Sequence, residues 1–250
     1  MTFVSLAASA AGCMDGVTEH RVRGNAHFRE KDFVGAIAEY DEGLKTRPND
    51  AATLILKGNA LYELGRLDDA YDAFAKAYAA DPKAADAIRG MAMIATTRSD
   101  LPDAATQFER MLGLPEHEHD SATRINLAKV DLALGKLDVA EQQAVEAAHE
   151  NGNDEAVLFT LGRVYVAEGK IDEANSTFSH LIEVAPGKPS GPYGLALVSA
   201  KQGDKAGVIA HVGEAMSKGM KDEDAQLIAK DKAFVAYKDD PAFLAATTKK

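Results

Sequence analysis

The chain has 250 residues, and its 39 acidic and 28 basic residues give a net charge of −11 at pH 7. Binding to nucleic-acid phosphates requires a basic surface, so this charge argues against a nucleic acid as a general partner. The single cysteine excludes an internal disulfide framework, and the sequence has no apolar run of about eighteen residues that would predict a transmembrane helix.

Residues 1–16 are an apolar N-terminal segment in which Ala10, Ala11 and Gly12 precede Cys13. This resembles a bacterial lipoprotein signal, in which the cysteine is lipidated and becomes the new N-terminus. No Lys or Arg precedes the run, and it is short for a secretory signal. The alternative is a short apolar helix in which Cys13 is an ordinary small residue. The first interpretation predicts a lipid-anchored, periplasm-facing envelope protein, for example at the outer membrane, and the second predicts a cytoplasmic one.

From Val17 onward the sequence repeats itself. The stretch "GNALYELGRLDDAYDAFAKAYAADP", which begins at Gly58, aligns with one that begins at Gly24 and another that begins at Gly162. Three weaker copies complete a set of six, with a spacing of 34 residues except where "LPEHEHD" inserts two. The predicted repeats are 17–50, 51–84, 85–120, 121–154, 155–188 and 189–220.

The positions within each repeat predict a helix, a tight turn and a second helix. Positions 8 and 20 are small in nearly every copy, and positions 17, 20, 24 and 27 form one apolar helical stripe. Position 15 is glycine in four copies, which suits a left-handed residue at the end of a helix. Proline at or near position 32 stops the second helix. No segment alternates with a period of two, so we expect no sheet.

These features resemble the tetratricopeptide repeat (TPR) family, with its 34-residue period and its small residues at positions 8 and 20. The resemblance implies an all-α fold, a right-handed α-solenoid of six helix-turn-helix units in which each unit packs on its neighbours. Residues 221–250 break the repeat but keep apolar residues at helical spacing. We expect them to form C-terminal capping helices with a frayed lysine tail.

In the resembled family, positions 2, 5, 9, 12 and 13 of the first helices line a concave groove. Those positions carry six basic and two acidic residues here, the reverse of the whole chain. The resemblance therefore predicts a basic groove with aromatic residues that binds an acidic or amphipathic protein segment. The predicted groove residues are Arg21, Asn25, Phe28, Arg29, Asn59, Tyr62, Arg89, Lys129, Phe159, Arg163, Tyr193 and Lys201.

The function that this implies is a non-catalytic interaction scaffold that assists the assembly of a bacterial envelope complex. The alternative is a soluble co-chaperone-like adaptor that recognises acidic C-terminal tails. Arg21, Asn25 and Arg89 match three of the five positions of the family's carboxylate clamp, whereas Leu56 and Met93 depart from it. The sequence leaves self-association open.

Catalytic motifs are absent from the sequence: we find no nucleophile elbow, phosphate loop or paired-cysteine metal site, and we expect no cofactor. The strongest candidate for metal chemistry is "PEHEHD", with His117, Glu118, His119 and Asp120. The two histidines are two residues apart and cannot share a helix face, so we interpret the segment as a polar insertion loop rather than a metal site.

Overall fold

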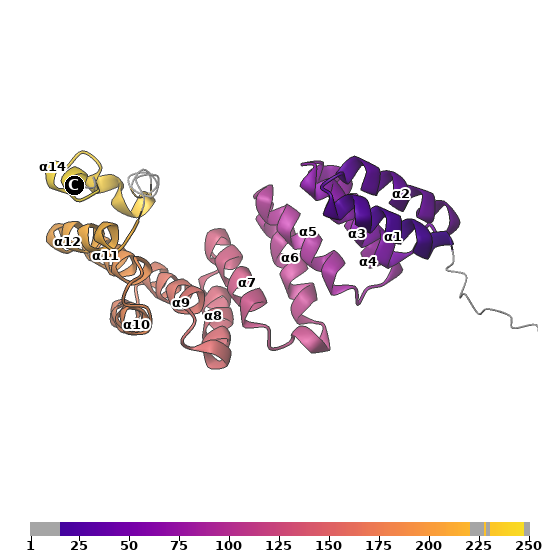
Figure 1. Cartoon of the computed structure of the whole chain (residues 1–250). Helices are drawn as coiled ribbons and strands as arrows, with labels where there is room; N and C mark the ends of the chain where they lie inside the picture. Colours follow the sequence, from indigo (N-terminus) through magenta and orange to yellow (C-terminus); the bar gives the residue numbers. More distant parts are fainter. Residues whose placement is uncertain (1–15, 221–227, 229–230, 248–250) are drawn as a thin grey trace, which may run out of the picture. The chain divides into compact units, whose positions relative to one another are not determined.

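The structure is a computed structural model that describes residues 16–220, 228 and 231–247 (Figure 1). The predicted N-terminal segment with Cys13, apart from Gly16, lies outside the described residues. The chain divides into two compact units, Met1–Arg98 and Ser99–Lys250. Within the described residues every regular element is helical, which confirms the predicted all-α class.

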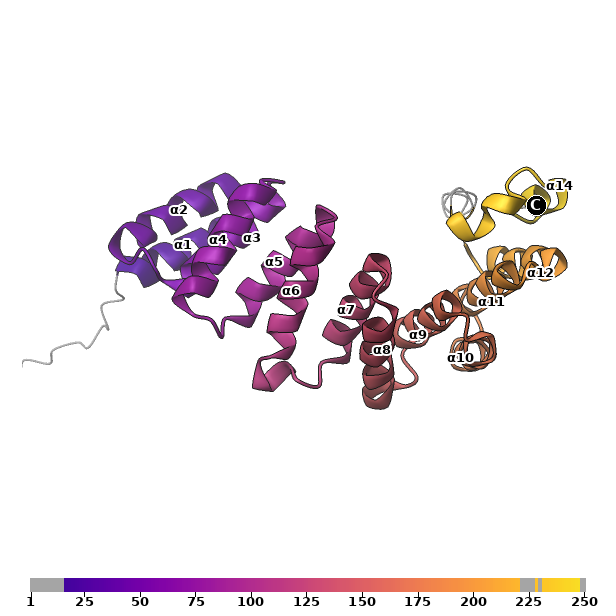
Figure 2. The same ribbon diagram turned by 180° about the vertical axis from the view of Figure 1, so that it is seen from behind.

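Consecutive helices lie side by side in pairs within each unit (Figures 1 and 2). The helices of the first unit are α1 (Gly16–Arg29), α2 (Phe33–Thr46), α3 (Ala51–Glu63), α4 (Leu67–Ala80) and α5 (Ala85–Thr97). Those of the second unit are α6 (Leu101–Leu112), η1 (Pro115–His117), α7 (Ser121–Leu134), α8 (Leu137–Asn151), α9 (Glu155–Glu168), α10 (Ile171–Val184), α11 (Ser190–Gln202), α12 (Lys205–Ser217), η2 (Lys232–Tyr237) and α14 (Pro241–Thr247).

Short side chains fix where many helices begin. An aspartate precedes six of the paired helices, and its carboxylate accepts a hydrogen bond from a backbone N–H of the first turn, where no intrahelical partner exists. These caps are Asp32, Asp50, Asp100, Asp120, Asp154 and Asp204. Each first helix starts within one residue of a predicted repeat start.

The turn inside each repeat uses a left-handed residue, as predicted. Gly65, Gly135, Gly169 and Gly203 have φ between 73° and 82°. The same position in repeats one and three holds Lys31 and Ser99, with φ of 61° and 59°. The turn geometry is therefore kept in all six repeats, even where the sequence provides no glycine.

The aromatic ring at position 24 is the centre of each well-formed repeat. Tyr40, Phe74 and Phe178 are completely buried, and each ring packs against the glycine at position 8 of the same repeat. A Cβ atom added to Gly24, Gly58 or Gly162 would lie less than 3.0 Å from that ring. The small residue at position 8 thus makes room for the buried ring of the same repeat.

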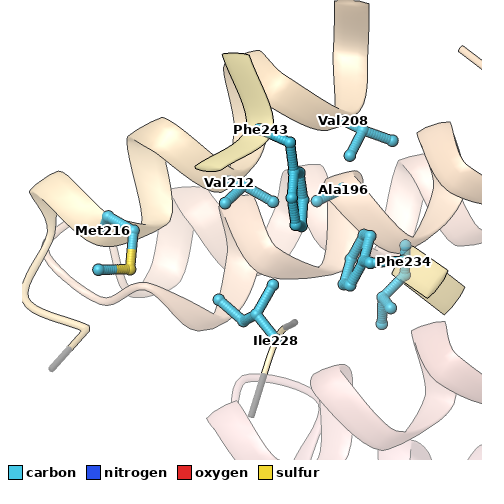
Figure 3. Close-up of a cluster of buried hydrophobic side chains, with 8 residues drawn as sticks. Ala196, Val208, Val212, Met216, Ile228, Phe234 and Phe243 are labelled. Atoms are coloured by element: carbon cyan, nitrogen blue, oxygen red, sulfur yellow. The ribbon is translucent and has the colours of Figure 1, made fainter. Parts of the chain in front are cut away.

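The end of the array is closed by an apolar cluster that the C-terminal residues complete. Helix α14 packs on α12 and η2 packs on α11. Figure 3 shows Phe243 pointing toward Val212 and Ala196, with Phe234 beside it. Phe234, Phe243 and Ile228 are each at most 1% exposed, so burial of apolar surface holds this cap in place.

Candidate functional site in the first-helix faces

The twelve predicted groove residues lie on the first helices of the repeats and none of them is buried. In the first unit they lie on α1, α3 and α5, and in the second on α7, α9 and α11. We call the residues at repeat positions 2, 5, 9, 12 and 13 of these helices the first-helix faces. Whether these residues bind a ligand stays a prediction, but their internal contacts distinguish them from one another.

The cations of the first unit already have partners within the chain. Arg21 lies 3.6 Å from a carboxylate oxygen of Asp50, and Arg89 forms an ion pair with Asp86. Asp50 also caps the N-terminus of α3, so the carboxylate that pairs with Arg21 is held in place by that helix. A ligand carboxylate would have to compete with these aspartates.

Asn25 also has an internal role. Its Oδ1 atom accepts a hydrogen bond of 2.8 Å from the hydroxyl of Tyr40, the buried ring of repeat one, and its backbone oxygen accepts one from Arg29 Nε. A buried hydroxyl without a partner would cost about 1–3 kcal/mol, so this contact stabilises the repeat. Phe28 packs edge-on against Phe33, with 5.2 Å between the ring centroids.

The cations of the second unit differ, because Lys129 of α7 and Arg163 of α9 form no ion pair with any described residue. Both occupy position 9, in successive repeats. Desolvation, followed by the charge of Arg163, lowers the pKa of Lys129, and Asp154 opposes this only in part. The two neighbouring positive charges therefore attract an anion, although Asp154, which lies near Lys129, offsets part of this attraction.

A hollow of about 270 Å³ lies beside Lys129. Its walls are partly apolar, through Ile125 and Val157, and Asn126 adds an amide that can both donate and accept hydrogen bonds. Asn126 was not among the predicted groove residues, because position 6 is not among the positions that line the groove in the resembled family. The lining residues are Ser121, Ala122, Ile125, Asn126, Lys129, Asn151, Asp154, Ala156 and Val157.

Aromatic rings continue the face from α9 to α11. The guanidinium of Arg163 lies 6.0 Å from the ring centroid of Phe159, at a distance that permits a cation–π contact. Phe159 in turn stacks on Tyr193, with 6.1 Å between centroids and 27° between the ring planes. Lys201 Nζ donates a hydrogen bond to the backbone oxygen of Ala167, so this ammonium group already has one partner at the C-terminal end of α9.

The C-terminal residues cover the repeat-six end of this face, a contact that the repeat pattern does not predict. The hydroxyl of Tyr193 donates a 2.7 Å hydrogen bond to Asp231, and the ring of Phe234 lies 5.9 Å from that of Tyr193. Burial, followed by the bond to Asp231, raises the pKa of the Tyr193 hydroxyl. Tyr193 is therefore only partly accessible to an external ligand.

The "PEHEHD" segment forms η1 and the turn that follows it. His117 lies 3.8 Å from Asp120, whereas His119 lies 3.0 Å from Glu150 on α8. The two imidazoles thus face different carboxylates. In the described part of the chain, no group of three or more His, Cys, Asp or Glu side chains is arranged to hold a metal ion. Among the same residues, no helix has both the length and the hydropathy of a membrane span.

Two models of the tetratricopeptide repeat family match the sequence, over residues 55–121 and 156–188. A tetratricopeptide repeat protein from Parabacteroides merdae superimposes with a TM-score of 0.76, at 16% identity, over 92% of this chain and 90% of that one. YrrB, described as a TPR protein with an unusual peptide-binding site, gives 0.60 at 22% identity, over 83% and 96%.

PilW, described as a widely conserved type IV pilus biogenesis factor, gives a TM-score of 0.62 at 14% identity, over 93% of this chain and 98% of that one. Among curated proteins, none matches the sequence. The helix pairs, the left-handed turn at position 15, the buried ring at position 24 and the two model matches agree with one another. Residues 55–121 and 156–188 therefore belong to the tetratricopeptide repeat family, and the helix pairs around them share its fold.

Proposed function

We propose that this chain is a non-catalytic scaffold that binds an acidic, amphipathic segment of a partner protein on the first-helix faces of α7 and α9. The observation that carries the proposal is the pair Lys129 and Arg163, two cations without ion-pair partners among the described residues, beside a partly apolar hollow. A partner carboxylate would neutralise the pair, and an apolar side chain would fill the hollow next to Ile125.

The first unit supports this binding mode less well. Arg21, Asn25 and Arg89, which match the carboxylate clamp of some family members, have partners in Asp50, Tyr40 and Asp86. An acidic tail would gain little there, because each contact would replace an existing one. The co-chaperone-like alternative rests on those three residues, so we favour the site on α7 and α9.

Charge reversal on α7 and α9 tests the proposal. We expect Lys129→Glu combined with Arg163→Glu to weaken the binding of a fluorescent acidic amphipathic peptide at least about tenfold, because attraction becomes repulsion. Fluorescence anisotropy with the full-length chain measures this. Lys83→Glu combined with Lys188→Glu is the matched control, since it makes the same charge change at exposed turns between repeats.

The control variant should bind within about twofold of the unmodified chain, and binding should weaken as salt is added. An equal loss in both variants would show that net charge, rather than a site, governs binding. Retained binding in the variant that carries both Lys129→Glu and Arg163→Glu would refute the site.

We extend the proposal to the bacterial cell envelope, with the chain held there by a lipid on Cys13 and assisting the assembly of an envelope complex. The support is the run of small residues before Cys13 and the likeness in fold to PilW. We expect the full-length chain to fractionate with membranes and Cys13→Ser to move it to the soluble fraction, since lipidation supplies the membrane affinity. A soluble unmodified chain that retains Met1 would contradict this placement and would leave the peptide site untouched.

A further inference from the structure

The segment Asp231–Tyr237 lies where a bound partner would lie on repeat six. Helix η2 packs on α11. Phe234 shares a cluster with Leu197, Tyr193 and Ala200, which are positions 9, 5 and 12 of that repeat. Val166, at position 12 of repeat five, packs against the same cluster. The segment therefore covers positions that line the groove in this family.

The chemistry of the contact is that of a ligand with one acidic and one aromatic anchor. Asp231 uses both carboxylate oxygens: Oδ2 accepts from the Tyr193 hydroxyl, and Oδ1 accepts from the backbone N–H of Ala233 at the start of η2. Three residues later, Phe234 is completely buried beside Tyr193 (Figure 3 shows its ring in the cluster). Val235 is 49% exposed, so the outer side of the segment faces solvent.

Helix α14 would keep its packing on α12 if the segment left this face, because Phe243 lies among Val208 and Val212 (Figure 3). Phe243 also contacts the rings of Phe234 and Tyr237 in η2, with 5.9 Å and 6.3 Å between the centroids. Release of η2 would therefore expose Phe234, uncover one side of Phe243 and break the bond between Asp231 and Tyr193. A tethered segment has an effective concentration of the order of millimolar, so it occupies the face strongly against a free competitor.

We propose that residues 231–237 are an intramolecular ligand of the first-helix face of repeat six, displaced by a partner segment with the same pattern of a carboxylate followed three residues later by phenylalanine. This rests on the proposed function, because the partner has to dock along the first-helix faces. Beyond the proposed function, it specifies the residue pattern of the partner and identifies a segment of the chain itself that competes with the partner. Partner binding then also releases η2.

The test uses a fluorescent peptide with the sequence of residues 231–240, "DKAFVAYKDD", and the full-length chain. In Phe234→Ala the internal segment loses its main anchor while α11 is unchanged. We expect this variant to bind the peptide at least about tenfold more tightly than the unmodified chain, because the tethered competitor is weakened. Val235→Ala, at an exposed position of the same segment, is the matched control and should bind like the unmodified chain.

Adding Tyr193→Phe to the Phe234→Ala variant removes the hydroxyl that would donate a hydrogen bond to the peptide carboxylate. The affinity for the peptide, raised by Phe234→Ala, should therefore fall again. Hydrogen exchange should show increased opening in residues 231–237 and unchanged protection in α11 and α12. If Phe234→Ala loosens α11 or α12, Asp231→Ala decides the matter, since it removes the bond to Tyr193 without leaving a cavity.

Equal peptide affinity in the released and unmodified chains, or binding that ignores Tyr193→Phe, would overturn the proposal. The site on α7 and α9 is tested with Lys129 and Arg163, in other repeats and with a different peptide. The two proposals can therefore fail separately.

Discussion

Gly162→Ala is expected to lower the free energy of unfolding by about 2 kcal/mol, although alanine is the better helix former by up to about 1 kcal/mol. Gly162 lies within α9, and an added Cβ atom would lie 2.5 Å from two ring carbons of Phe178. The ring cannot move away, because a Cβ added to Gly194 on α11 would lie only 2.1 Å from the same ring. Phe178 is completely buried between the two glycines, so overpacking exceeds the gain in helix propensity.

The matched control is Gly213→Ala in α12, where the nearest atom to the added Cβ is Ala246 Cβ at 3.9 Å. There only helix propensity acts, and we expect an increase of about 0.5–1 kcal/mol. Urea unfolding followed by circular dichroism gives both values. A similar stabilisation in the two variants would mean that the ring of Phe178 moves at little cost. The space for this ring would then not be the reason for a small residue at position 8. Combining Gly162→Ala with Phe178→Leu should restore part of the loss, because leucine frees space.

The period of the repeat was enough to predict the helix pairs, since it depends on residues inside each unit. Gly65 and its equivalents predicted the left-handed turn directly. Lys31 and Ser99 take the same conformation without a glycine, because the helices on both sides determine the path of the chain there. The left-handed turn was predicted only for the four copies that have glycine at position 15.

Contacts between neighbouring repeats were harder to predict. Gly90 and Gly194, at position 6, touch the ring of the preceding repeat as closely as position 8 does, yet only two of the six copies have glycine there. The sequence also placed all six cations of the first-helix faces on the correct helices. The sequence did not predict that Arg21 and Arg89 form ion pairs with carboxylates whereas Lys129 does not. Ion pairing depends on the direction in which each side chain points.

The segment Asp231–Tyr237 escaped prediction for a different reason. It follows the last repeat, so the period gives no information about where it packs. Phe234 and Tyr237 are three residues apart, with exposed residues between them, and this spacing predicts a helix with one apolar side. The spacing does not predict which surface of the chain that side covers. The proposed partner pattern therefore comes from the packing of this segment on α11 rather than from the alignment of the repeats.

Asp131 is the second position at which we expect a large effect. It lies in α7 at position 11, which is filled by Leu61 in repeat two, and it is 1% exposed. No described residue donates a hydrogen bond to either carboxylate oxygen, and Lys136 Nζ, at 3.6 Å, is beyond hydrogen-bond distance. Desolvation raises the pKa of Asp131, Lys136 lowers it in part, and the nearby charge of Glu109 raises it further.

Replacing Asp131 should therefore stabilise the chain at neutral pH. We expect Asp131→Asn to gain about 1 kcal/mol by removing a buried charge, and Asp131→Leu to gain about 2–3 kcal/mol by also removing the unsatisfied polar atoms. Urea unfolding at pH 7 measures both. A less stable Asp131→Asn variant would show instead that the carboxylate and Lys136 attract each other by more than desolvation costs.

The pH dependence separates the charge from the packing. Because the pKa of Asp131 is higher in the folded chain than in the unfolded one, the folded state holds the proton more tightly, and this group's contribution to stability falls as pH rises from about 4 through the folded pKa. The advantage of Asp131→Asn over the unmodified chain should thus be full at pH 7 and shrink toward pH 4. In Asp131→Leu the part of the gain that comes from apolar packing should persist at pH 4, since no titration governs it. A constant difference between Asp131→Asn and the unmodified chain across this range would mean that Asp131 titrates alike in both states, and its burial would then carry no electrostatic cost.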